Sequence, residues 1–303
     1  MLFGKVKFYK INKDFPIDEQ SLTNSLSKYL FQKIDRTQIS TQGFVNPFSQ
    51  YADKPVYGMS GAFMVCLRED SKPIPASAIK RKTNFRVRDL EKKKGEKATK
   101  EEKDDIKEQI TSEMVSQFPL DFVKTKHVNA IIFPKNNLLA IDTTSSKDCE
   151  LIMAMLRTAI GTLPVIEFEA DSMPTMVMTE WLRDSSSVPD SLELGHECQL
   201  KDESDEKGAV VACKNQELAS DEIEAHLDAG KVVSMVAVEW NDSLRFKIKD
   251  DLTIVGVTYT DFLKERLKDD SGEGKAPEKF DAELAIAVEN LRMLAPNILE
   301  MFS

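Results

Sequence analysis

The chain has 303 residues, of which 41% are hydrophobic and 30% charged, a composition that predicts a folded protein of two or three sub-domains and excludes a disordered one. Its formal net charge of -10 at pH 7 and its pI of about 5.1 speak against nucleic-acid binding unless basic residues converge in space, because most nucleic-acid-binding proteins are basic overall. No apolar run reaches the roughly 18 residues of a membrane span and no signal peptide is recognisable, so we expect a cytoplasmic protein without a membrane partner.

The first part of the chain predicts strands and one helix. Residues 5–11 alternate apolar side chains with lysines and predict a strand. A helix follows, with Asp18 or Ser21 available to cap its first amides. Prolines and glycines predict irregular chain with short extended pieces over residues 43–61, and the apolar run 62–67 predicts a strand buried on both faces.

A helical hairpin is predicted next, with helices over residues 76–94 and 100–116. Thr99 and Glu102 have the spacing of a capping box, which places the start of the second helix. Apolar residues are few, namely Ile79, Phe85, Val87 and Leu90 in the first helix and Ile106, Ile110, Met114 and Val115 in the second. Because the hairpin can bury so little, we expect it to project from the body of the protein as a tip.

Positive charge is concentrated in this hairpin. Between Lys80 and Lys107 there are twelve Lys or Arg against seven Asp or Glu, a balance of plus five, so the rest of the chain stands near minus fifteen. Such a separation indicates an anionic partner or a like-charged body that must be kept out of the contact. The alternative is an ordinary solvated hairpin, and the lysines of residues 100–107, which are interleaved with acids, fit that alternative.

Sheet structure is predicted again after the hairpin. Residues 127–133 and 138–141 predict two strands joined by a turn-rich link of hairpin length. Ser145 or Ser146 then caps a helix that Gly161 ends, before a further strand at 163–168. This order of elements predicts an α+β fold with mostly antiparallel pairing.

The composition changes beyond Thr179. Between Glu180 and Asp228 there are fourteen acidic residues against four Lys or Arg, so this region is strongly negative. The remaining predicted elements are an exposed loop at 203–207, a strand at 210–213, a helix capped by Ser220 and ended by Gly230, a hairpin of strands 232–240 and 244–248, a strand at 254–259 and a C-terminal helix at 281–302.

Few residues suggest catalysis or a cofactor. The four cysteines, Cys66, Cys149, Cys198 and Cys213, lie far apart in the sequence and indicate reduced thiols rather than a disulfide framework. The segment His196-Glu197-Cys198 could, together with Cys213, supply three metal ligands in all, but the spacing fits no common zinc pattern and a fourth ligand is missing. With no glycine-rich phosphate loop and no carboxylate pair set apart by its spacing, we expect no cofactor, no metal and no enzymatic activity.

Two other positions favour a binding role. Lys214, Asn215 and Gln216 lie between a short strand and the Ser220 cap, where their amide and ammonium donors could reach phosphate oxygens, although a plain polar loop is the alternative. Phe122 follows a helix, a proline and an acid, so it is either an exposed interface anchor or a core phenylalanine.

Several segments resemble the RdgC family of recombination-associated proteins over nearly the full chain: Leu156-Arg157 with 160–165, Thr179-Glu180-Trp181-Leu182-Arg183, 220–223 running to 229–233, and Phe280-Asp281-Ala282-Glu283. The resemblance implies a ring-shaped homodimer of horseshoe subunits with a positively lined hole for double-stranded DNA. It also implies sequence-nonspecific DNA binding, with single-stranded DNA as a further ligand, association with the nucleoid, and restraint of RecA by competition for DNA.

The resemblance also suggests a domain plan. Residues 1–75 and 119–175 would form a central α+β domain with the helix 281–302 packed on it, 76–118 the projecting tip, and 176–280 a base domain.

Site residues carried over from the family lie near the interface that the tips would form and in the base. Phe122 matches an interface phenylalanine, and Lys214 and Gln216 fall in a basic loop. Asn215 stands where a second lysine is usual and Leu120 where an arginine is usual, and each departure removes a charge that could face phosphate. Within the tip, the residues we expect to face DNA are Lys80, Arg81, Lys82, Arg86 and Arg88.

Two alternatives remain open at this stage. The acidic region 180–228 could bind a basic protein, which would make the chain an adaptor with the lysine-rich hairpin as a solvated lever. An enzyme that acts on DNA is a weaker third possibility, which a nuclease assay with magnesium would expose.

Overall fold

The computed structural model describes residues 3–12, 17–48, 54–202, 208–271 and 276–303. Contacts divide the chain into two compact units. Unit 1 comprises Met1–Leu26, Asn46–Cys66 and Val128–Ser303, and unit 2 comprises Ser27–Val45 and Leu67–His127. The fold is α+β with mostly antiparallel strands, as the sequence predicts.

The sheet of unit 1 is organised around its first strand, β1 (Lys5–Ile11). One edge of β1 pairs with β6 (Leu138–Ile141), and the opposite edge pairs with β12 (Ile254–Tyr259) and then with the short β7 (Val165–Glu167). All three pairings are antiparallel, so a single N-terminal strand joins the middle of the chain to its C-terminal third.

The remaining strands of unit 1 extend the sheet on both sides of β1. Its strand order is β4-β5-β6-β1-β12-β11-β10-β8-β9, so β9 is the last strand in the order, and β3 pairs with β4. The bounds are β3 Val56–Met59, β4 Ala62–Ser71, β5 Lys124–Phe133, β8 Leu192–Asp202, β9 Val210–Lys214, β10 Lys231–Trp240 and β11 Leu244–Lys249. β4 and β5 are long enough to continue from unit 1 into unit 2.

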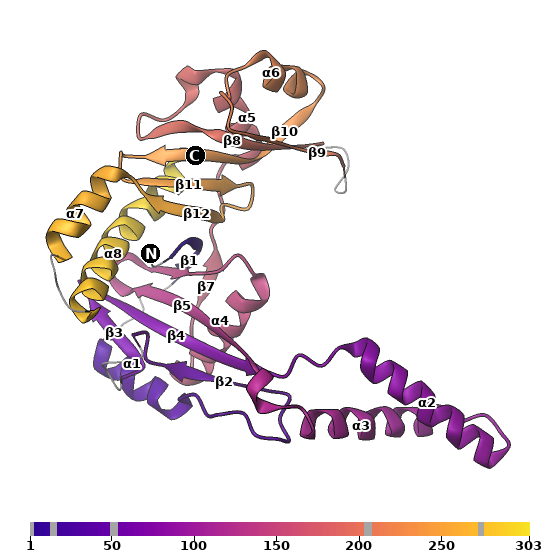
Figure 1. The fold of residues 1–303 in the computed structure, drawn as a ribbon. Coiled ribbons are helices and arrows are strands. Elements are labelled where there is room, and N and C mark those ends of the chain that lie inside the picture. The colour runs from indigo at the N-terminus through magenta and orange to yellow at the C-terminus, as the bar shows by residue number, and fades with distance from the viewer. Residues whose placement is uncertain (1–2, 13–16, 49–53, 203–207, 272–275) are drawn as a thin grey trace. The chain divides into compact units, whose positions relative to one another are not determined.

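Helices lie against this sheet, with α5 and α6 beside β8 and β10 and the long α8 running along the sheet (Figure 1). Their bounds are α1 Glu19–Leu26, α4 Ser146–Ile160, α5 Pro174–Arg183, α6 Asp221–Asp228, α7 Asp261–Ser271 and α8 Ala276–Met301, with 3-10 turns at Ser27–Tyr29 (η1), Pro134–Asn136 (η3) and Ser185–Ser187 (η4). No helix of the described ranges is both long enough and apolar enough to cross a membrane.

Capping decides the alternatives that the sequence leaves open. The Asp18 carboxylate accepts a hydrogen bond from the backbone N–H of Ser21 (2.9 Å), so Asp18 and not Ser21 caps α1. Ser145 accepts from the N–H of Asp148 and Gly161 ends α4 with a φ of 90°, a left-handed conformation that glycine adopts freely. Ser220 does precede α6, but its hydroxyl makes no capping hydrogen bond.

The structure contains elements that the sequence reading did not predict. These are α5, α7 and β8, whereas the short extended pieces predicted within residues 43–61 are present as the end of β2 (Ser40–Val45) and all of β3. Ser60 and Gly61, both with positive φ, form the two-residue turn between β3 and β4. The predicted loop at 203–207 lies outside the described residues.

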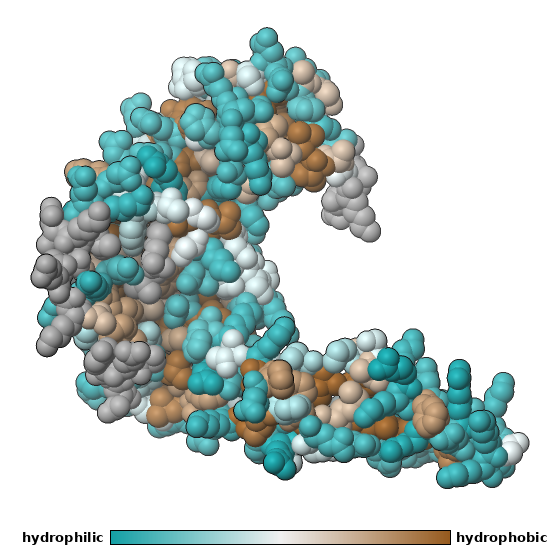
Figure 2. Space-filling view, viewed as in Figure 1, coloured by the Kyte–Doolittle hydropathy of each residue, from teal (hydrophilic) through white to brown (hydrophobic). Residues whose placement is uncertain are grey.

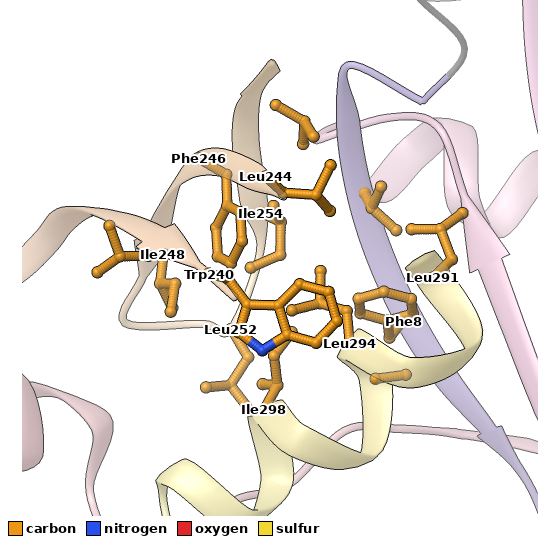
Figure 3. Packing of buried hydrophobic residues seen from close by; sticks show 14 of the residues in the cluster. Phe8, Trp240, Leu244, Phe246, Ile248, Leu252, Ile254, Leu291, Leu294 and Ile298 are labelled. Carbon is orange, nitrogen blue, oxygen red and sulfur yellow. The ribbon is translucent and has the colours of Figure 1, made fainter. Parts of the chain in front are cut away.

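The core of unit 1 is centred on Trp240, which is 1% exposed. Figure 3 shows its indole ring between strand residues such as Phe246 and the α8 residues Leu294 and Ile298. The C-terminal helix therefore packs its apolar face on the sheet, as its helical spacing predicts.

Unit 2 contains the predicted hairpin and the segments that hold its base. Its elements are β2 (Ser40–Val45), η1, the ends of β4 and β5, α2 (Ala76–Lys94), α3 (Lys100–Ser116) and the 3-10 turn η2 (Leu120–Phe122). Both helices have the predicted bounds, and Gly95 ends α2 with a φ of 76°. The capping box is confirmed: the Glu102 N–H donates to Thr99 Oγ1 (3.2 Å) and the Thr99 N–H to Glu102 Oε2 (2.9 Å).

The base of the hairpin is held by a buried lysine. Lys72 is 3% exposed, and its ammonium group donates to the carbonyl oxygens of Asp35 (2.8 Å), Arg36 (3.0 Å) and Val115 (3.0 Å). Three charge-assisted hydrogen bonds compensate for its removal from water. Because Val115 lies in the last turn of α3, the cation also stabilises the negative end of the helix dipole.

The contact between α2 and α3 is narrow. Its buried residues are Val87, Ala98, Ile106 and Ile110, with Ile79, Leu90 and Met114 packed against them. Phe85, which we counted among the apolar residues of α2, takes no part in this contact and is 69% exposed. The reason is geometric: Phe85 lies on the side of α2 opposite the α3-facing row, since residues turn by about 100° each along a helix.

Candidate nucleic-acid interface

One face of α2 gathers cations around an exposed aromatic ring. Arg81, Phe85, Arg88 and Lys92 follow one another at spacings of four, three and four, so they form a single stripe on the helix. All four are exposed. Within the described residues, Arg81, Arg88 and Lys92 form no ion pair, so their charges face solvent. We call these four residues the α2 stripe.

The other basic residues predicted on α2 lie beside the stripe. Lys80 and Lys82 are exposed on its two sides. Arg86 lies nearer α3, where its guanidinium contacts Glu113 (3.4 Å). A hollow on this side of α2 is lined by Arg81, Lys82, Phe85, Arg86, Asp89, Ile110 and Glu113.

Charge is distributed unequally between the two helices of the hairpin. α2 has eight Lys or Arg and two acids, a balance of plus six, whereas α3 has three lysines and six acids, a balance of minus three. Figure 2 shows hydrophilic side chains over most of the visible hairpin surface, with scattered apolar patches. The positive potential therefore belongs to α2, and the lysines of α3 are neutralised by their neighbours.

The predicted basic loop of unit 1 is less positive than the α2 stripe. Lys214, the last residue of β9, is exposed but lies opposite Glu197 of β8 in the strand register. The neighbouring Lys247 is paired with Glu197, and its hydrogen bond holds the pKa of that carboxyl below the usual range. Cations and acids thus balance around this loop, which limits its attraction for phosphate.

The backbone explains why asparagine suits position 215. Asn215 has a φ of 55°, in the left-handed region that asparagine tolerates better than lysine does. Gln216 is half-buried, and its backbone N–H donates to the carbonyl oxygen of His196 (3.4 Å), which folds the loop back on β8. Asn215 lines a groove with Glu193, Gly195, His196, Glu197, Glu239, Arg245 and Lys247.

Phe122 is exposed, which excludes the core alternative within this chain. Its side chain is 71% exposed at the end of η2, and Leu120 of the same turn is 46% exposed. Leu120 therefore adds apolar surface to the turn that carries Phe122. Two large apolar side chains on one short turn are typical of a surface that a partner covers.

Phe85 and Lys92 are the residues of the α2 stripe that the sequence reading did not select. The spacing of Arg81, Phe85, Arg88 and Lys92 carries the signal, but the prediction counts Phe85 only among the few apolar residues of the helix. For metals, no group of three or more His, Cys, Asp or Glu side chains that could hold an ion occurs in the described ranges.

Comparison with known proteins matches the whole chain. A family model described as "RdgC: Putative exonuclease, RdgC" matches residues 1–303. The chain is 37% identical over 303 residues to the Recombination-associated protein RdgC of Colwellia psychrerythraea, covering 100% of this chain and 97% of that protein. It is 32% identical over 301 residues to the protein of the same name from Pseudomonas fluorescens (strain Pf0-1), covering 99% and 96% of the two chains.

The fold and the site define an α+β protein that presents one strongly basic helix face from a narrow helical hairpin. With a match over its full length and relatives above 30% identity, the chain belongs to the RdgC family.

Proposed function

We propose that this chain is a sequence-nonspecific double-stranded DNA-binding protein that acts in recombination as a ring-shaped homodimer around DNA. In this proposal the protein associates with the nucleoid and restrains RecA by competing for DNA. The α2 stripe carries the proposal, because its cations are exposed and are not paired with described acids. The family relationship supports it, since the relatives are named Recombination-associated protein RdgC.

A ring accounts for binding to a polyanion by an acidic protein. The net charge of -10 would repel DNA if it were spread evenly. If the basic face of α2 lines the hole and the acidic surface lies outside, DNA meets only the positive side. Phosphate contacts carry no base information, so such a protein binds without sequence preference.

The test is duplex binding as a function of salt. Fluorescence anisotropy with duplexes of unrelated sequence should give similar affinities that fall steeply with salt, because each phosphate contact releases counterions and contributes about 0.9 to the logarithmic slope. An affinity that stays flat with salt, or that depends strongly on sequence, would contradict the proposal. A parallel incubation with magnesium and end-labelled DNA shows whether the protein also degrades DNA.

Phe122 should anchor the homodimer. We expect Phe122→Ser to weaken self-association by about 30-fold or more, as loss of an interface hot spot of about 2 kcal/mol would. Its exposure means that the fold itself should be unaffected. Sedimentation equilibrium measures the effect, and Phe85→Ser, at a similarly exposed phenylalanine, is the matched control. An unchanged dimer in Phe122→Ser would remove Phe122 from the interface.

Phe85 should act on single-stranded DNA. Its exposed ring lies between arginines one turn away in each direction, an arrangement that can stack an unpaired base while the arginines hold the adjacent phosphates. We expect Phe85→Ser to lower the affinity for single-stranded DNA by about 10-fold, within the roughly 1–3 kcal/mol of one stacked base, and to leave duplex affinity nearly unchanged. Equal losses on both DNA forms would show that the ring does not stack on bases.

A further inference from the structure

Two of the four cysteines are direct neighbours in the sheet. Cys198 of β8 and Cys213 of β9 are opposite each other in the antiparallel register, with Glu197 opposite Lys214 on one side and Gln199 opposite Ala212 on the other. Directly opposed residues of antiparallel strands have Cα atoms about 4.5–5.5 Å apart, within the range of about 4.4–6.8 Å that a disulfide requires. The separation of these cysteines in the sequence concealed this pairing.

The two thiols differ in their access to solvent. Cys198 is 1% exposed, whereas Cys213 is half-buried on β9, the last strand in the sheet order. Burial raises the pKa of the Cys198 thiol to about 12, and a hydrogen bond to the Cys213 sulfur adds to this rise. The strand register makes the two thiols neighbours, and Cys213 is the one that a reagent in solution reaches first.

We propose that Cys198 and Cys213 form a thiol-oxidation site that closes to a cross-strand disulfide with a small disulfide such as oxidised glutathione. The Cys213 thiolate attacks the glutathione disulfide, forms a mixed disulfide and releases one glutathione thiolate. The Cys198 sulfur, losing its proton to solvent, then attacks the Cys213 sulfur and displaces the second glutathione. The two cysteines lose two electrons and two protons, and oxidised glutathione is reduced to two thiols.

The location of the disulfide gives it a structural consequence. Cys213 immediately precedes Lys214, the basic residue that ends β9. A covalent link to β8 at this position holds the edge strand in its register and opposes local opening of β9. This consequence and the disulfide itself are independent of the proposed DNA binding.

The test starts from the full-length reduced protein incubated with oxidised glutathione, then quenched with acid and alkylated. We expect the intact mass before alkylation to fall by two hydrogen atoms, and non-reducing peptide mapping to join the Cys198 and Cys213 peptides. Hydrogen exchange should slow at the amides of β9 and stay unchanged in β1. In Cys198→Ser, Cys213 should remain as the glutathione adduct, and in Cys213→Ser the buried Cys198 should stay unmodified.

The other two cysteines, and other possible oxidation products, also test the proposal. Cys66 and Cys149 are both buried, so the double variant Cys66→Ala/Cys149→Ala should still form the disulfide. A wild-type protein that retains glutathione on Cys213 would overturn the proposal. A disulfide between Cys213 residues of two chains, one that includes Cys66 or Cys149, or four thiols that all stay reduced would do the same.

Discussion

Replacing Arg81, Arg88 and Lys92 together by glutamate should lower the affinity for duplex DNA on the order of 100-fold or more near 0.1 M salt. Each phosphate contact contributes about 0.9 to the logarithmic salt slope, so loss of three contacts should also reduce that slope by about three. The three side chains are exposed and lie opposite the α3-facing row, so the hairpin should fold normally. Anisotropy titrations at several salt concentrations measure both quantities.

The matched control is on the other helix of the same hairpin. Lys100, Lys103 and Lys107 are equally exposed but belong to α3, where acids outnumber lysines. Their replacement by glutamate changes the net charge by the same amount and should change the affinity only slightly. Equal losses in the two triple variants would mean that net charge, and not the α2 stripe, determines binding.

The five basic residues selected from the sequence should not contribute equally. Arg81 and Arg88 belong to the α2 stripe, Lys80 and Lys82 flank it, and Arg86 is paired with Glu113. An exposed ion pair weakens the contact that either charge can make with a third group. Reversal of Lys80, Arg81 and Lys82 also separates DNA binding from the adaptor alternative, because it should spare any partner bound through the acidic region 180–228.

Elements with regular apolar spacing and defined ends were predictable from the sequence. The predicted bounds are those observed for β1, β12, α2 and α3. Their signals are local: apolar residues at strand spacing indicate the two strands, Gly95 ends α2, and the Thr99–Glu102 capping box starts α3. The sequence does not predict α5, although Pro174 stands at its first position and Met178 and Leu182 have helical spacing, because Met173 at its N-cap supplies no capping side chain.

Features that depend on tertiary packing could not be predicted from local sequence patterns. The pairing of Cys198 with Cys213 depends on strand register. Register between two strands is not encoded in the spacing of neighbouring residues. Lys72 illustrates the same point. It directly follows the end of β4, and nothing in the neighbouring sequence indicates that its ammonium group is buried against three carbonyl oxygens.

Trp240→Ala should destabilise unit 1 by about 3–5 kcal/mol, the cost of removing a large buried aromatic side chain. The ring is 1% exposed and lies where β10, β11 and α8 meet, so the cavity cannot be filled by solvent-exposed groups (Figure 3).

Trp240→Phe is the informative comparison. No described residue accepts a hydrogen bond from the indole Nε1, so the substitution removes a buried N–H that gains nothing from its site. We therefore expect Trp240→Phe to lower the free energy of unfolding by less than about 1.5 kcal/mol, in the range of near-conservative core substitutions. Urea unfolding followed by circular dichroism, at one protein concentration because self-association adds to apparent stability, measures both variants. If Trp240→Ala and Trp240→Phe lower the free energy of unfolding equally, then the indole N–H, and not the ring volume, accounts for the contribution of Trp240. An acceptor for that N–H must then exist.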